Sequence, residues 1–103
     1  MIVPHVRCSL QGSFVALPTP FRNGEIDYAA LQTLIEWHVA EKTDGLVIAG
    51  TTGEAASLSD NERRGLFDAA VACARGRLPI VAGVGTNCTR TTIEMAKGAV
   101  SAG

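Results

Sequence analysis

The sequence predicts an α/β fold in which the strands of a parallel sheet alternate with helices. Three short runs are almost entirely apolar, which is typical of parallel strands covered on both faces: residues 14–17, 46–49 and 80–84. Between these runs, the apolar residues recur at helical spacing. Successive runs begin 32 and 34 positions apart, which is about the length of one strand, one helix and two loops. We therefore interpret the chain as three βα units.

The first unit pairs strand 14–17 with a helix that we expect from Asp27 to Glu41. Asp27 is a good N-cap, and Asn23-Gly24 is predicted to turn the chain between strand and helix. Five residues recur on one face of this helix: Leu31, Leu34, Ile35, His38 and Val39. Because His38 lies on this apolar face, we expect a buried histidine with a satisfied hydrogen bond rather than a catalytic one.

The second and third units follow the same plan. Strand 46–49 precedes a helix that starts at a capping box, in which Ser59 and Glu62 are three positions apart. Strand 80–84 precedes a helix that begins after Thr89 and ends at Gly103. The second helix has an apolar stripe made of Leu66, Phe67, Ala70, Val71 and Ala74, and the third is expected to carry Ile93, Ala96 and Val100 on its inner face.

Three successive βα units leave one face of the sheet without cover, because right-handed crossovers place all three helices on the same side. Two architectures are compatible with this pattern: a small doubly wound domain and the first three-eighths of a (βα)8 TIM barrel. A flavodoxin-like doubly wound domain needs at least two more strands. We therefore favour the barrel, with residues 1–11 as an N-terminal arm and residues 12–103 as part of the barrel domain.

Composition and charge exclude several classes of function. Nine Lys and Arg against ten Asp and Glu give a net charge of −1, so we expect neither a nucleic-acid partner nor a membrane partner. His5 and Arg7 interrupt the stretch in which a signal peptide is apolar, so a cytoplasmic location is expected. Cys8, Cys73 and Cys88 form no disulfide framework and no metal-ligand pattern. We expect reduced thiols and no metal site.

The candidate chemistry lies at the carboxyl ends of the strands, which form the functional edge of parallel α/β sheets. Residues 50–54, Gly-Thr-Thr-Gly-Glu, directly follow the second apolar run. The hydroxyl and backbone N–H groups of Thr51 and Thr52 can bind a small carboxylate or relay protons. An alternative remains open, in which the segment is a tight turn whose threonines cap local backbone. Gly85 and Asn87, after the third run, are weaker candidates.

Other reactive or aromatic side chains have structural interpretations. Cys88 is expected to be a buried or half-buried thiol, and Phe21 is expected to pack against its surroundings. Tyr28 and Trp37 lie on the first helix, where we expect them to cover the surface or form an interface.

Three segments at the strand ends resemble the dihydrodipicolinate synthase/N-acetylneuraminate lyase family: residues 16–21, 44–54 and 79–87. The similarity runs from about Gly12 to Gly103 in the right order and spacing. The string Gly-Thr-Thr-Gly-Glu is more similar to the synthase branch than to the neuraminate lyases, which tend to carry Ser-Thr there. The resemblance implies a (βα)8 barrel in which a lysine forms a Schiff base with pyruvate. The pyruvate is then added to an aldehyde, without a cofactor.

The resemblance also implies roles for residues of this chain. Thr51 would belong to a Thr–Tyr–Tyr proton relay, and Thr52 and Gly53 would bind the pyruvate carboxylate. The family's Schiff-base lysine, relay tyrosines and substrate arginine lie in later units. Lys42 precedes the second strand and Lys97 lies within the third helix, so neither occupies the carboxyl end of a strand that the reaction needs.

A possible effector site is implied as well. Some synthases bind lysine as a feedback inhibitor, and Ala56 and Asn87 agree with the residues that they use. Asp60 and Thr91 stand where lysine-sensitive members carry His and Glu, so we expect lysine inhibition to be weak or absent.

The resemblance leads us to expect a pyruvate-dependent lyase, most like the synthases whose aldehyde is aspartate semialdehyde and whose pathway leads to lysine. The full-length enzyme would be a homotetramer with small-molecule substrates, and this fragment alone would be inactive. Two alternatives remain. One is another pyruvate aldolase, of the 2-keto-3-deoxy sugar acid or N-acetylneuraminate type, and the other is a small flavodoxin-like binding module.

Overall fold

The computed structural model describes residues 10–103. Only Leu10 and Gln11 of the predicted N-terminal arm fall within this range, and both are exposed. The expectations for His5 and Cys8 lie outside the described residues. The elements follow in the order β1 (Phe14–Ala16), β2 (Phe21–Arg22), β3 (Glu25–Ile26), α1 (Tyr28–Ala40), β4 (Gly45–Ile48), the 3₁₀ turn η1 (Ala55–Ser57), α2 (Asp60–Ala74), β5 (Ile80–Ala82) and α3 (Thr89–Ala102).

The main sheet is parallel and has the strand order β1-β4-β5. Val15 lies opposite Leu46, and Leu46 lies opposite Ile80. The three predicted strands are therefore aligned side by side, with these three residues in one row across the sheet. Each strand ends one or two residues earlier than expected. The backbone nevertheless stays extended after β1, where the Leu17 N–H donates to the Val47 carbonyl at 3.0 Å.

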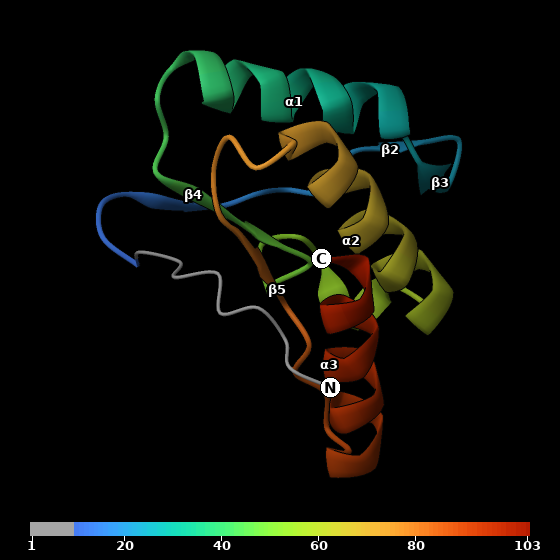
Figure 1. Cartoon of the computed structure of the whole chain (residues 1–103). Coiled ribbons are helices and arrows are strands. Elements are labelled where there is room, and N and C mark those ends of the chain that lie inside the picture. The colour runs from blue at the N-terminus through green and yellow to red at the C-terminus, as the bar shows by residue number, and fades with distance from the viewer. Residues whose placement is uncertain (1–9) are drawn as a thin grey trace.

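All three helices cover the same face of the sheet, as right-handed crossovers require (Figure 1). The central helix, α2, contacts both α1 and α3 and packs over β4 and β5. The core between helices and sheet is apolar and contains Leu17, Leu31, Ile35, Leu46, Ile48, Leu66, Phe67, Ala70 and Met95. His38 is buried in α1, where its Nδ1 lies 2.8 Å from the Thr43 hydroxyl, which confirms the expected interior histidine.

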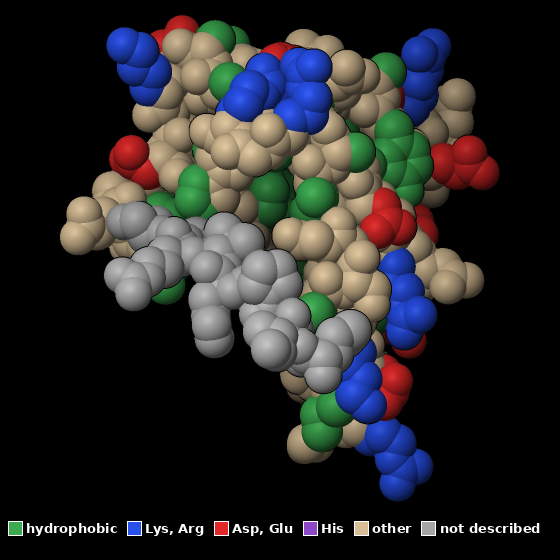
Figure 2. Space-filling view, in the orientation of Figure 1, with side chains coloured by type: hydrophobic (Ala, Val, Ile, Leu, Met, Phe, Trp, Pro, Cys, Tyr) green, Lys and Arg blue, Asp and Glu red, His purple; other side chains and the backbone are tan. Residues whose placement is uncertain are grey.

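No helix within residues 10–103 covers the opposite face of the sheet (Figure 1). Strand alternation and the register assign four side chains to this face: Phe14, Ala16, Val47 and Val81. Ala16 is exposed and the other three are only half-buried. The space-filling view shows hydrophobic side chains between the charged groups of the visible surface (Figure 2). This face is the bare side that the strand pattern predicted.

Local signals account for the starts of α1 and α2. The Ala30 N–H donates to the Asp27 carboxylate at 2.9 Å, so Asp27 is the N-cap as expected. Ser59 and Glu62 form the predicted capping box, in which each side chain accepts from the other residue's backbone N–H.

The turn at Asn23-Gly24 was expected between the first strand and its helix, and in the structure it joins two additional short strands, β2 and β3. Both residues have positive φ, 53° and 80°, which fits a two-residue type I′ hairpin turn between β2 and β3. Phe21, which was expected to pack against its surroundings, lies on this hairpin with 41% of its side chain exposed. Tyr28 and Trp37 lie at the surface of α1, as expected.

The inner face of α3 is the main error of the sequence-based prediction. Ile93 and Val100 are 50% and 63% exposed. The residues that pack inward are instead Met95, which is 1% exposed, together with Ala99 and Ala102. Small side chains face α2 here and let the two helices approach, while the larger β-branched residues remain outside. No helix within residues 10–103 is long and apolar enough to cross a membrane.

Candidate active site

The three parallel strands end at the same edge of the sheet, which we call the carboxyl edge. It consists of the loops that follow β1, β4 and β5: residues 17–20, 49–57 and 83–88. The sequence-predicted site residues Thr51, Thr52 and Gly53 lie in the second loop, and Asn87 lies in the third. The fold therefore brings to one edge three segments whose first residues are more than 30 positions apart in the chain.

The loop after β4 is a compact turn that leaves its hydroxyls free. The Glu54 N–H donates to the Thr51 carbonyl at 3.0 Å and the Ala55 N–H to the Gly50 carbonyl at 3.3 Å. Thr51 and Thr52 are both exposed, and neither hydroxyl bonds to another group within residues 10–103. The interpretation in which the threonines cap local backbone is therefore not what the structure shows. Their hydroxyls remain available to a ligand.

Gly53, in the loop after β4, is buried against the loop after β1. Its carbonyl accepts a 2.7 Å hydrogen bond from the hydroxyl of Thr19, which is itself buried. A Cβ at position 53 would lie 3.1 Å from both the Thr19 hydroxyl oxygen and the Ala49 Cα. Gly53 therefore permits close packing within the edge, while Thr51 and Thr52 present their side chains outward. Sequence reasoning assigned no role to Thr19, whose only signal was its place between two prolines at a strand end.

The loop after β5 packs directly on the end of β4. The Gly83 N–H donates to the Ile48 carbonyl at 2.7 Å. A Cβ on Gly83 would overlap the Ala49 carbonyl and lie 2.8 Å from the Gly50 nitrogen. Only glycine permits this approach without a backbone shift, so position 83 fixes the distance between the two loops.

Hydrogen bonds of two threonines, Thr86 and Thr92, fix the segment that leads into α3. The Thr86 N–H donates to the Thr92 hydroxyl at 3.1 Å, and the Thr86 hydroxyl donates to the Cys88 carbonyl at 2.8 Å. The Cys88 N–H returns a hydrogen bond to the Thr86 hydroxyl at 3.1 Å. Asn87, between them, is exposed at the carboxyl edge.

The expectation that the Cys88 thiol is buried or half-buried was wrong. It is exposed and lies at the N-cap position of α3. Donor groups in the first turn of α3, chiefly the side chain and backbone N–H of Thr91 and then the backbone N–H of Arg90, lower the pKa of the Cys88 thiol. Sequence reasoning placed this residue on the right edge but misjudged its exposure, because a loop thiol carries no burial signal of its own.

Arg63 is a buried cation at this edge to which the sequence analysis assigned no role. Arg63 is only 5% exposed, whereas Arg64 is exposed. The Arg63 Nη1 donates to the carbonyl of Gly85 at 3.1 Å and to that of Gly83 at 3.4 Å. Its Nε donates to the Ala55 carbonyl at 3.4 Å. The guanidinium thus joins the loops after β4 and β5.

The four residues of the possible effector site also lie near the carboxyl edge. Ala56 is exposed in η1, and Asp60 is exposed as the first residue of α2. Asn87 precedes α3, and Thr91 is half-buried in its first turn.

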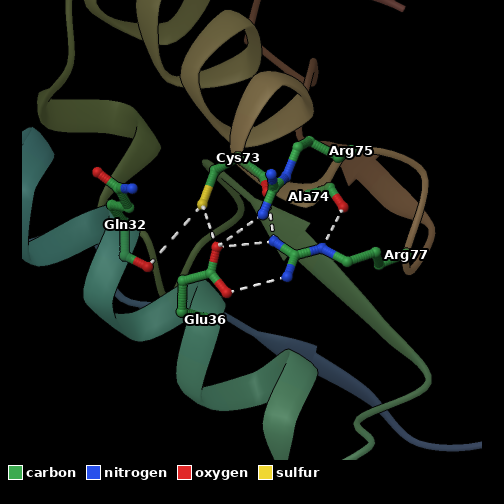
Figure 3. Close-up of polar contacts among 6 residues, drawn as sticks. All are labelled: Gln32, Glu36, Cys73, Ala74, Arg75 and Arg77. Atoms are coloured by element: carbon green, nitrogen blue, oxygen red, sulfur yellow. Dashed lines mark hydrogen bonds and ion pairs between the residues drawn. The ribbon is translucent and has the colours of Figure 1, made fainter.

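A second polar cluster lies toward the amino ends of the strands and connects α1 with the turn before β5 (Figure 3). The Arg77 guanidinium donates to both carboxylate oxygens of Glu36, at 2.7 and 3.0 Å. Arg77 and Arg75 lower the pKa of Glu36, whereas desolvation and the nearby Glu36 carboxylate raise that of the Cys73 thiol. Because this end of α/β barrels carries stability rather than chemistry, we interpret the cluster as structural.

Within residues 10–103, no group of three or more His, Cys, Asp or Glu side chains is arranged to hold a metal ion. Lys42 is exposed in the turn before β4, at the amino ends of the strands. Lys97 is exposed on α3 and pairs with Glu94 at 3.3 Å. Neither lysine lies at the carboxyl edge.

Residues 9–103 match the family described as the dihydrodipicolinate synthetase family. The chain belongs to this family. A 4-hydroxy-tetrahydrodipicolinate synthase from Rhodospirillum centenum is 50% identical over 93 residues, which are 90% of this chain and 32% of that protein. The chain spans about a third of the length of the curated relatives that it matches.

Solved structures of the dihydrodipicolinate synthetase family have the same fold. The dihydrodipicolinate synthase of Aquifex aeolicus superposes with a TM-score of 0.90 at 44% identity, over 91% of this chain and 32% of that one. The chloride-inhibited dihydrodipicolinate synthase of Acinetobacter baumannii, in complex with pyruvate, superposes with a TM-score of 0.89 at 42% identity. This match covers 92% of the present chain and 33% of that one. The chain therefore has the fold of the opening three βα units of a TIM barrel and not that of a flavodoxin-like domain.

Proposed function

We propose that this chain supplies the N-terminal units of a pyruvate-dependent lyase, most like 4-hydroxy-tetrahydrodipicolinate synthase, which condenses pyruvate with aspartate semialdehyde. The observation that carries the proposal is the free pair of hydroxyls, Thr51 and Thr52, at the carboxyl edge of a chain 50% identical to such a synthase. The other pyruvate aldolases of the family would differ in the aldehyde, and the relatives named here favour aspartate semialdehyde.

In this proposal, Thr51 passes a proton between the substrate and the rest of a relay. Its hydroxyl both donates and accepts, so it can take a proton on one side while releasing another. Thr52 and Gly53 hold the pyruvate carboxylate, because the Thr52 hydroxyl and the backbone N–H groups of this turn are donors suited to an anion. The lysine that forms the Schiff base is supplied by a later unit of the barrel.

The proposed enzyme is a cytoplasmic homotetramer. Free thiols at Cys73 and Cys88 agree with a reducing compartment. The assembly rests on the resemblance alone, and light scattering of the complete protein measures it directly.

The test uses a completed barrel, in which residues 10–103 of this chain replace the equivalent N-terminal part of the Rhodospirillum centenum relative. We expect it to condense pyruvate with aspartate semialdehyde at a rate within about tenfold of the unmodified relative. Borohydride should trap one pyruvate per chain, read by intact mass. A folded barrel that traps pyruvate but condenses only other aldehydes would transfer the assignment to another aldolase, and a folded barrel that traps none would refute the proposal.

Lysine feedback is tested in the same protein. Asp60 offers a lysine ligand a carboxylate where sensitive enzymes carry an imidazole, and Thr91 offers a hydroxyl where they carry a carboxylate. We expect weak or absent inhibition, and we expect the double variant Asp60→His, Thr91→Glu to increase it. Strong inhibition of the unmodified barrel by lysine would contradict this expectation.

A further inference from the structure

The burial of Arg63 requires an explanation, because a charged side chain is rarely removed from water without a partner. Arg63 is 5% exposed, and no carboxylate within residues 10–103 forms an ion pair with it. The acid next to it, Glu62, is already engaged with the Ser59 N–H in the capping box. Its Nε and Nη1 groups instead donate to backbone carbonyls of the carboxyl edge.

These carbonyls belong to the segments that present the proposed site residues. Ala55 directly follows the Thr51–Glu54 turn, and its N–H closes that turn on the Gly50 carbonyl. Gly83 and Gly85 begin the loop that carries Asn87. A single side chain on α2 therefore bonds to both loops, 8 residues away in one direction and 20 and 22 in the other.

We propose that Arg63 is a positioning residue, which sets the location of the Thr51-Thr52 turn relative to the loop after β5. The inference rests on the proposed function, because the positioned hydroxyls are those of the proton relay and the pyruvate site. Proton transfer depends steeply on donor and acceptor placement, so a small displacement of the turn lowers turnover. Arg63 itself does not contact substrate in this proposal.

The planar guanidinium suits this task. Its Nε and Nη1 donate in two fixed directions at once, toward Ala55 and toward the glycines of the β5 loop. A lysine keeps the charge and an aliphatic stem but has one compact donor group, which cannot hold both loops in the same geometry. Arg63→Lys therefore separates the positioning role from the presence of charge.

The experiment compares Arg63→Lys and Arg63→Met in the completed barrel with matched changes at the exposed Arg64. Hydrogen exchange is measured in residues 49–57 and 83–88, with the exchange of α1 as the internal reference. The kcat, the pyruvate KM and the amount of borohydride-trapped adduct are measured for the same variants. We expect Arg63→Lys to exchange about tenfold faster in the two loops alone and to lose about tenfold or more in kcat. Trapping continues, because the lysine lies on a later unit, and the Arg64 variants match the unmodified barrel.

Several results would overturn the positioning role. Loop exchange and kcat that stay within about twofold in Arg63→Lys would do so, as would faster exchange spread evenly over α1 and the core. If both Arg63 variants fail to fold while the Arg64 variants fold, Arg63 serves fold stability and the positioning role is wrong. If the unmodified barrel folds but neither traps pyruvate nor turns over, the proposed function fails, and loop exchange in the Arg63 series still decides whether Arg63 orders the two loops.

Discussion

At the residue scale, the carboxyl edge contains two kinds of side chain. The position of some follows from the sequence, and the position of others depends on the tertiary fold. Thr51 and Thr52 could be assigned to the edge because they directly follow an apolar strand run. Arg63 could not, because a charged residue in a helix is expected at the surface. Only the fold brings the Gly83 and Gly85 carbonyls to its guanidinium.

Thr51→Val tests the proton relay directly. Valine keeps the volume of threonine but removes the hydroxyl, so we expect kcat in the completed barrel to fall by about 10²-fold or more, with a much smaller change in pyruvate affinity. Steady-state kinetics measure both. Thr33→Val is the matched control, because among residues 10–103 the Thr33 hydroxyl bonds only to the Ala29 carbonyl, on the exposed side of α1. Unchanged turnover in Thr51→Val would remove Thr51 from the relay.

The two described cysteines should differ in their reactivity toward alkylation. The thiolate is the reactive form, and the pKa is lowered at the exposed Cys88 but raised at the half-buried Cys73. As pH increases, alkylation of Cys88 should therefore rise and reach its plateau at a lower pH than that of Cys73. Peptide mass spectrometry after brief iodoacetamide pulses at several pH values reads each site separately. Equal pH profiles would show that the donor groups of Thr91 do not stabilise the thiolate.

At the scale of elements, local signals predicted α1 and α2 because their caps are chemically distinctive and their apolar stripes contain large residues. The strands were equally readable from their apolar runs, although their ends depend on ladder hydrogen bonds. The orientation of α3 was not predictable in the same way. This helix has two apolar stripes, one through Ile93 and Val100 and one through Met95 and Ala99, and contact with α2 selects the second one.

Gly83 provides a test of how β5 meets β4. A methyl group there would overlap the Ala49 carbonyl, so Gly83→Ala should cost about 1–3 kcal/mol of unfolding free energy through a forced backbone shift. Gly85→Ala is the control, since a Cβ at that position meets nothing within 4 Å, and we expect a change within about 0.5 kcal/mol. Urea unfolding of the completed barrel measures both. Equal stability of the two variants would mean that the close approach at Gly83 relaxes without cost.

At the scale of the whole molecule, the three helices cover one face of the parallel sheet, no helix within residues 10–103 covers the other face, and β1 and β5 are the edge strands of the described sheet. We expect the 103-residue chain alone to be aggregated or molten, because open edges pair with other chains and the bare apolar face has no cover. Size-exclusion chromatography and near-ultraviolet circular dichroism measure this. Pyruvate with borohydride should give no stoichiometric adduct at Lys42 or Lys97, and a folded monomer carrying one such adduct would contradict the barrel-fragment interpretation.

The bare sheet face also has a consequence for how such a protein is made. A ribosome adds about 5–20 residues per second, so the remaining two thirds of a relative like the Rhodospirillum centenum synthase take on the order of 10–40 s to synthesise. During that interval the face that contains Phe14, Val47 and Val81 has no later strands to meet. Nascent chains of this family are therefore expected to expose an apolar surface for far longer than a helix or hairpin needs to form. Binding by a chaperone at this stage would protect them from aggregation.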